Sequence, residues 1–185
     1  MKDFSLYEHA LEIVAHASEN LGDLALVSRR DYDERATFRF RAKVPCLEYI
    51  SLLIESAVLL RANRAGRVYV GFEKLSCMEP IADRFMRIAD LSERLYVFGE
   101  TDWQPPRHPN LRLVQLNAAQ RLAREWFVIV NSPTQRVALV ARDEDGFDAP
   151  DLDERTFSAL KTSAPAHVEQ LASAAEDVID SSLAG

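Results

Sequence analysis

Residues 67–100 read RVYVGFEKLSCMEPIADRFMRIADLSERLYVFGE, and the class of the fold follows from this segment. Its two ends, Arg67–Phe72 and Arg94–Gly99, are rich in valine, tyrosine and phenylalanine, a composition typical of buried strands. Between them, Pro80–Leu91 predicts a helix that opens with a proline. A strand, a helix and a strand at this spacing predict a right-handed crossover between two parallel strands.

Three further strands are predicted downstream of this unit. Leu111–Leu116 is the first of them. Glu125–Val130 and Arg136–Arg142 flank the turn-forming segment Asn131–Gln135, which predicts an antiparallel hairpin. The sequence therefore predicts an α/β fold, with a mixed β-sheet that contains a βαβ unit and a C-terminal antiparallel hairpin and is covered by helices.

The C-terminal part is predicted to be helical after an acidic loop at Gly146–Asp153. A short helix is expected at about Asp153–Leu160, and a longer amphipathic one at Pro165–Leu183. The longer helix carries an apolar stripe, which can pair with a partner or a second copy of the chain if it is exposed. This stripe consists of Val168, Leu171, Ala172, Ala175, Val178 and Ile179.

At the N-terminus, Ser5 and Glu8 have the spacing of a capping box and predict the start of a helix. Gly22 is placed to end that helix. A short strand at Leu24–Ser28 and a polar turn at Arg29–Glu34 are expected to follow.

Basic and apolar side chains alternate along a strand predicted at Ala36–Lys43. Three interpretations of its basic face are open. It can contact an acidic partner, or keep an edge strand from pairing with another sheet. It can also face the acidic C-terminal segment, because residues 143–185 hold 11 acidic and 2 basic residues. The basic residues are Arg35, Arg39, Arg41 and Lys43.

A helix predicted at residues 45–63 and ended by Gly66 is apolar around most of its circumference. Its polar residues form a narrow seam of Glu48, Ser51 and Glu55. A helix of this kind is expected to be buried on several sides. It is therefore either a central core helix or a helix shared between the core and a dimer partner.

The composition bounds the class of protein. The chain has 185 residues, 48% of them hydrophobic, which suits a single α/β domain over residues 1–185. A net charge of −7 argues against nucleic acid as a partner. The longest apolar stretch, Ile50–Leu60, is too short to span a bilayer, and no secretory signal pattern opens the chain. Together with only two cysteines, these features indicate a cytoplasmic protein that does not bind membranes.

A candidate ligand site lies where the two parallel strands end, because ligands of open α/β sheets bind beyond the carboxyl ends of such strands. Each strand end has a glycine, which permits a turn or a close approach to the backbone. Aromatic faces, carboxylates and a hydroxyl follow, which suits a small cationic or hydrogen-bonding organic ligand. Alternatively, these are ordinary strand-end turns, with the tryptophan packed over the sheet edge. The candidate residues are Gly71, Phe72, Glu73, Gly99, Glu100, Thr101, Asp102 and Trp103.

The sequence contains no catalytic motif. The glycine patterns of dinucleotide and P-loop sites do not occur, and the four histidines lack the spacing of a metal site. The sequence therefore identifies no cofactor and no catalytic or metal-binding residue. The enzymatic hypothesis that remains is acid–base chemistry by Glu73, Glu100 and Asp102.

Several segments are similar to one known family. They are Leu53–Glu55, Arg67–Glu73, Leu95–Gly99, Glu125–Val130 and Val137–Glu144. Together they resemble the DICT sensory domain, which is named for its occurrence with diguanylate cyclases and two-component systems. The resemblance covers about residues 48–168, between the N-terminal helix and strands of residues 5–43 and the amphipathic helix of residues 165–183.

The resemblance implies a non-catalytic cytoplasmic module of prokaryotic signalling. Such a module is expected to bind a signal and pass it to an output domain, with the amphipathic helix of residues 165–183 as the natural transmitter. Together with the strand-end residues, this predicts a sensor that binds a small-molecule signal and relays it through helix contacts to an output protein or a homodimer partner. It acts either as a stand-alone sensor or as a piece of a longer protein. No ligand and no catalytic residue carries over from the resemblance. The alternative is a ligand-free module for protein–protein interaction or dimerisation.

Overall fold

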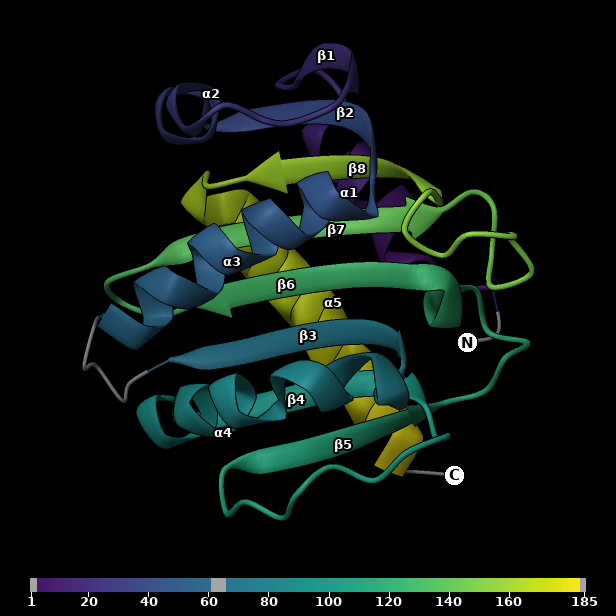
Figure 1. The fold of residues 1–185 in the computed structure, drawn as a ribbon. Helices are drawn as coiled ribbons and strands as arrows, with labels where there is room; N and C mark the ends of the chain where they lie inside the picture. Colours follow the sequence, from purple (N-terminus) through teal and green to yellow (C-terminus); the bar gives the residue numbers. More distant parts are fainter. Residues whose placement is uncertain (1–2, 61–65, 184–185) are drawn as a thin grey trace.

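The computed structural model describes residues 3–60 and 66–183, and in these residues eight strands form one mixed sheet (Figure 1). The predicted α/β fold is thereby confirmed. Across the sheet the strands are β1 (Glu19–Leu24), β2 (Thr37–Lys43), β8 (Thr156–Thr162), β7 (Arg136–Asp143), β6 (Glu125–Asn131), β3 (Arg67–Lys74), β4 (Arg94–Glu100) and β5 (Leu111–Leu116).

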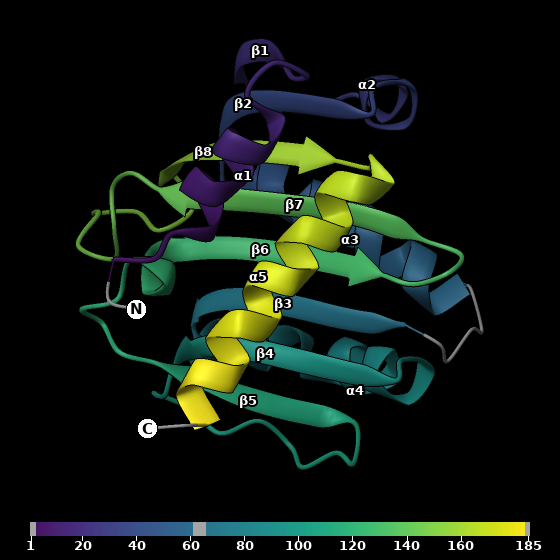
Figure 2. The same ribbon diagram turned by 180° about the vertical axis from the view of Figure 1, so that it is seen from behind.

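Helices cover both faces of this sheet. One face carries α3 (Val44–Leu60), the 3-10 helix η1 (Leu75–Ile81) and α4 (Ala82–Leu91). The other carries α1 (Leu6–Val14) and α5 (Pro165–Leu183), and Figure 2 shows α5 crossing the strands obliquely. The short helices α2 (Arg29–Glu34) and η2 (Arg121–Arg124) lie in connections.

The βαβ unit and the hairpin form as predicted. β3 and β4 are parallel neighbours, with Val70 opposite Val97, and β5 extends the parallel part on the other side of β4. β6 and β7 are antiparallel, with Val128 opposite Leu139. Because β3 also pairs with β6, the hairpin joins the βαβ unit directly.

The prediction of a helix at Asp153–Leu160 is wrong, because most of this segment belongs to β8, which lies between β2 and β7. Phe157 packs on the α3 side of the sheet and Leu160 on the α5 side. Lys161 is also buried, and its Nζ donates hydrogen bonds to the carbonyl oxygens of Tyr32 (2.8 Å) and Arg35 (3.0 Å). A strand buried on both faces lacks the polar–apolar alternation that identifies a strand from sequence.

The N-terminal elements also differ from the prediction. The first helix ends at Val14, and residues 19–24 form β1, so the strand expected at Leu24–Ser28 is wrong. Gly22 has φ +73° and lies where the β1–β2 register shifts, so it serves a bulge instead of a helix end. The polar turn expected at 29–34 is α2, which is stabilised by ion pairs four residues apart, such as Arg29–Asp33 (2.8 Å).

The basic strand is internal, so its interpretation as an edge strand is wrong. β2 lies between β1 and β8, and β1 forms the edge of the sheet. Arg41 pairs with Glu144 (2.8 Å), and Lys43 pairs with Glu154. The interpretation in which the basic face contacts the acidic C-terminal segment is therefore confirmed for these two side chains.

The apolar stripe of α5 is not exposed. All six of its residues are buried against the sheet and α1, so the expectation that this stripe is free for a partner is wrong. The sheet requires a cover on this face because β3, β6 and β7 present apolar side chains there. Within the described residues, no helix is both long and apolar enough to cross a membrane.

α3 is buried on one side only. Its inner side, with Ile50 and Ile54, packs on the sheet, whereas Leu52 and Leu60 are 43% and 85% exposed. The interpretation as a central core helix is therefore wrong, and a helix shared between the core and a dimer partner stays a prediction. The end of this helix predicted near residue 63 lies outside the described residues.

A buried carboxylate anchors α1 to the sheet. Glu125, the first residue of β6, accepts hydrogen bonds from Ser5 Oγ and from the backbone N–H groups of Leu6 (2.9 Å) and Tyr7 (3.2 Å). These N–H groups have no partner within the helix, so the carboxylate completes the N-terminal cap. Burial raises the pKa of Glu125 to about 7, while the hydrogen bonds act in the opposite direction.

We expect this shift to make the protein more stable at pH 5.5 than at pH 8. The carboxyl titrates near 4.5 when exposed in the unfolded chain. Between these pH values the folded protein therefore holds more protons, and its free energy of unfolding falls as pH rises. Urea unfolding of Glu125→Gln is expected to show a smaller fall, by on the order of 1 kcal/mol. An equal fall in both proteins would contradict the assignment.

Candidate functional site

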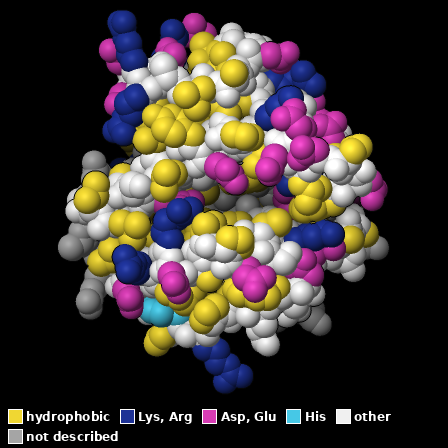
Figure 3. All heavy atoms as spheres, in the orientation of Figure 1, with side chains coloured by type: hydrophobic (Ala, Val, Ile, Leu, Met, Phe, Trp, Pro, Cys, Tyr) yellow, Lys and Arg dark blue, Asp and Glu magenta, His cyan; other side chains and the backbone are white. Residues whose placement is uncertain are grey.

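A cavity of about 630 Å³ opens on the α3 face at the carboxyl end of β3. β3 and β6 form its floor, α3 one wall, and η1 with the start of α4 the opposite wall. Residues of the connection between β7 and β8 close one end. Figure 3 shows this face hollowed near its centre. The volume lies within the range of roughly 300–1,000 Å³ that is typical of small-molecule sites.

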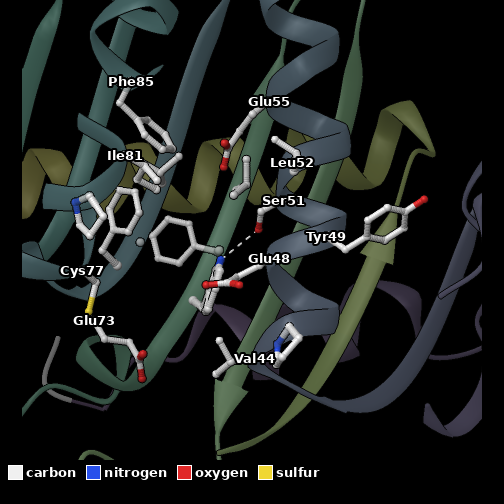
Figure 4. A pocket seen from close by; sticks show the side chains of 18 of the residues that line it. Val44, Glu48, Tyr49, Ser51, Leu52, Glu55, Glu73, Cys77, Ile81 and Phe85 are labelled. Carbon is white, nitrogen blue, oxygen red and sulfur yellow. Dashed lines mark hydrogen bonds between the residues drawn. The ribbon is translucent and has the colours of Figure 1, made fainter. Parts of the chain in front are cut away.

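The polar seam of α3 faces this cavity (Figure 4). Glu48, Ser51 and Glu55 are three and four residues apart and therefore share one side of the helix. Ser51 and Glu55 are buried, and Ser51 Oγ accepts a hydrogen bond from Trp126 Nε1 (3.1 Å). The apolar side chains of α3 on either side of the seam pack the helix onto the sheet. The polar groups of the seam therefore lie at the inner surface of the protein, where the cavity leaves room for them.

Glu55 and Arg84 connect the two helical walls. Glu55 Oε2 lies 2.6 Å from Arg84 Nε, as an ion pair that lacks the alignment of a hydrogen bond. Glu55 is only 4% exposed, and burial raises its pKa to about 7 although Arg84 acts to lower it. The cavity thus contains a carboxyl group that exchanges a proton near neutral pH.

Glu73 enters the cavity from a bulge in β3. It has φ +61°, in the left-handed region that non-glycine residues seldom adopt. The pairing of β3 with β4 shifts at this point, between Gly71 and Lys74. Bulges of this kind redirect a side chain, and here the side chain belongs to a carboxylate that is 2% exposed.

Arg155 joins Glu73 to the connection between β7 and β8. Its Nη1 lies 3.2 Å from Glu73 Oε2 and 2.8 Å from Asp143 Oδ2, and all three side chains are buried. The ring of Phe147 lies against the guanidinium, with the ring centre 4.3 Å from Arg155 Cζ. Burial raises the pKa of Glu73 to about 8, with Arg155 lowering it and Asp143 raising it. This ion cluster fixes the end wall of the cavity to its floor.

Only the first three of the residues predicted for the site line the cavity. Gly71, Phe72 and Glu73 line the cavity. The second set does not line it, so the two strand ends do not open onto one shared hollow. This second set comprises Gly99, Glu100, Thr101, Asp102 and Trp103.

The entry into η1 fills the space above the end of β4. A Cβ atom on Gly99 would lie 3.0 Å from Leu75 Cδ2. Asp102 accepts hydrogen bonds from the N–H (2.9 Å) and Oγ (2.5 Å) of Ser76 and so caps η1. Trp103 packs against the apolar core, as the alternative interpretation of these residues expected.

Sequence reasoning did not assign to the cavity the residues contributed by other elements. The polar seam of α3 was visible as a pattern, but the pattern alone does not show which element it faces. The end wall at Phe147, Leu152, Asp153 and Arg155 has no sequence signal, because Arg155 reaches Glu73 across 82 positions.

Comparison with known proteins identifies a family. The model of DICT, described as a sensory domain in diguanylate cyclases and two-component systems, matches residues 46–144. The match stops short of the limit near residue 168 that the resemblance suggested. No curated protein matches the chain.

Among solved structures, the chain is similar to polyphosphate kinase from Porphyromonas gingivalis, with 16% identity and a TM-score of 0.49. The similarity covers 76% of this chain and 23% of the kinase, so the chain spans about a quarter of that protein. A likeness this distant carries no argument about activity.

The DICT match covers more than half of the chain and includes α3, β3 and β6, which build the cavity. The function associated with this family is sensory, within signalling proteins. The chain belongs to the DICT family of sensory domains.

Proposed function

We propose that this chain is a non-catalytic sensor that binds a small organic molecule in the cavity between α3 and η1–α4. The observation that carries the proposal is the cavity itself, which combines an apolar lining with the buried carboxyl groups of Glu55 and Glu73. Sites for small organic molecules have this composition of apolar walls and a few placed polar groups.

The arrangement of the carboxylates supports binding over catalysis. Glu55 and Glu73 each form an ion pair with an arginine. Glu100 and Asp102, which the enzymatic hypothesis requires beside Glu73, are outside the cavity lining. The proposed acid–base groups therefore do not converge on one substrate position.

The proposed relay runs through α3. The polar seam of this helix lines the cavity. Leu52, which also lines it, and Leu60 on the same helix are exposed. A ligand that displaces α3 changes the surface it offers to an output protein or to a second copy of the chain. The same exposed leucines favour the second candidate function, a ligand-free interaction module.

Blocking the cavity tests the proposal. Leu52 lines the cavity and is partly exposed, so Leu52→Trp is expected to place an indole in its mouth. A ligand found by thermal-shift screening of a metabolite panel should bind this variant at least about tenfold more weakly in calorimetry, a loss of about 1.4 kcal/mol. Leu60→Trp, on the same helix but away from the cavity, is the matched control and should bind normally.

A second readout uses the two tryptophans of the chain. In a Trp103→Phe background, Trp126 is the remaining tryptophan and lies in the cavity lining. A bound ligand is expected to change its fluorescence. Ligands that bind equally well to the Leu52→Trp variant, or that leave Trp126 unaffected, would place the site elsewhere. A panel without any ligand would favour the interaction module.

A further inference from the structure

We propose that the cavity selects an organic cation, an amine or guanidine carried on an apolar body. This inference rests on the proposed function and adds the chemical class of the ligand. It stands on the juxtaposition of an excess of carboxylates over cations with aromatic rings in one cavity.

Carboxylates outnumber cations in the cavity lining. Its acidic residues are Glu48, Glu55, Glu73 and Asp153, and its basic residues are Arg84 and Arg155. Both arginines are already engaged, Arg84 by Glu55 and Arg155 by Glu73 and Asp143. An anionic ligand would have to displace a carboxylate from an arginine, whereas a cationic ligand would not.

Two carboxylates of α3 have capacity left for a ligand. Glu48 forms no ion pair within the described part of the chain. Glu55 Oε2 and Arg84 Nε lie 2.6 Å apart as an ion pair, but neither atom has an aligned hydrogen-bond partner among the described residues. A buried acceptor without an aligned donor is costly, and a ligand N–H group would supply one to Glu55. Figure 4 shows the Glu55 side chain directed from α3 into the cavity.

Aromatic rings complete a lining suited to cations. Phe72, Trp126 and Phe147 line the cavity. A cation is attracted to the face of such a ring when it lies within about 6 Å of the ring centre. Phe147 already contacts two cations of the protein in this way, with Lys74 Nζ 4.5 Å and Arg155 Cζ 4.3 Å from its ring centre. The ligand cation is therefore expected at Phe72 and Trp126. The apolar remainder of the lining accommodates the body of the ligand.

Three probes of similar size and different charge test which ligand charge the cavity prefers. They are 2-phenylethylamine, 2-phenylethanol and 3-phenylpropanoate, measured at pH 8 by calorimetry and by Trp126 fluorescence in the Trp103→Phe background. The amine is expected to bind at least about tenfold more tightly than the alcohol, and the carboxylate more weakly than either. An amine that binds no better than the alcohol overturns the inference.

Variants of the carboxylates provide the second test. Glu55→Gln is expected to weaken binding of the amine about tenfold and to leave binding of the alcohol within about twofold. Glu48→Gln, at a more exposed position, is expected to weaken binding of the amine severalfold and cannot disturb the core. Glu12→Gln, an exposed residue of α1 on the other face of the sheet, is the control. Unchanged amine binding in both cavity variants would also overturn the inference.

The outcomes separate this inference from the proposed function. If the alcohol or the carboxylate binds best and the Leu52→Trp variant loses it, the cavity is a ligand site of another class. The inference then fails and the proposed function stands. If none of the probes and no member of the metabolite panel binds, both fail together.

Discussion

Arg155→Met is expected to lower the free energy of unfolding by about 3–5 kcal/mol, because it leaves the buried carboxylates of Glu73 and Asp143 without their shared cation. Methionine retains the apolar stem of Arg155, so the loss reports the charge, its hydrogen bonds and the contact of the guanidinium with Phe147. For a chain of this length the melting temperature should fall by roughly 10 °C. Urea and thermal unfolding measure both quantities.

Two controls separate the buried cluster from ion pairs in general. Arg41→Met removes the partly exposed contact with Glu144 near the same connection and should destabilise the protein far less than Arg155→Met, because water screens exposed ion pairs. Adding Glu73→Gln and Asp143→Asn to Arg155→Met should restore much of the lost stability, because no buried charge then lacks a partner. A triple variant as unstable as Arg155→Met alone would show that packing, not charge, holds this wall.

Gly71→Ala is expected to lower the free energy of unfolding by about 2–3 kcal/mol. A Cβ atom at this position would lie 2.3 Å from Cε1 of Phe127, inside a well-packed core on the α5 side of the sheet. Neither strand nor ring can move without disturbing its neighbours, so the added methyl group causes strain. Gly99→Ala meets the flexible end of Leu75 at 3.0 Å and should cost less.

Shortening the opposing ring tests this explanation. Phe127→Leu removes the aromatic atoms nearest to Gly71 and by itself creates a small cavity. In the double variant the alanine methyl group occupies part of that space, so the combined loss should be at least about 1 kcal/mol smaller than the sum of the single losses. Additive losses would mean that the glycine is required for its backbone freedom and not for its size.

The sequence was sufficient for elements whose patterns are local. Runs of valine and aromatic residues located β3 and β4, a turn-forming segment located the hairpin, and α5 begins and ends where predicted. It was insufficient where a distant element decides the structure. Lys161 is buried because its ammonium group donates hydrogen bonds to carbonyl oxygens at the end of α2. No local pattern in residues 156–162 shows this contact, and a helix is predicted where β8 forms.

The same distinction between local patterns and distant contacts holds for the candidate site. The rule that ligands bind beyond parallel strand ends pointed to the carboxyl end of β3, and the cavity lies there with Glu73 in its lining. It failed for β4 because the closure by Leu75 and Asp102 depends on how the chain enters η1. The glycine of β3 was correctly noticed but wrongly explained, since its missing side chain accommodates Phe127 on the far face of the sheet.

The position of β8 between β2 and β7 has a consequence for synthesis on the ribosome. Thr37 of β2 and its sheet neighbour Thr162 are 125 positions apart. Residues 37–43 therefore lack this partner strand until residues 156–162 have emerged. The N-terminal cap of α1 likewise cannot form before Glu125 has been translated. Pairings between distant residues are also slow to form, because a long loop must close. We expect the βαβ unit and the hairpin to assemble first, and the N-terminal strands to join late, when β8 provides the edge they need.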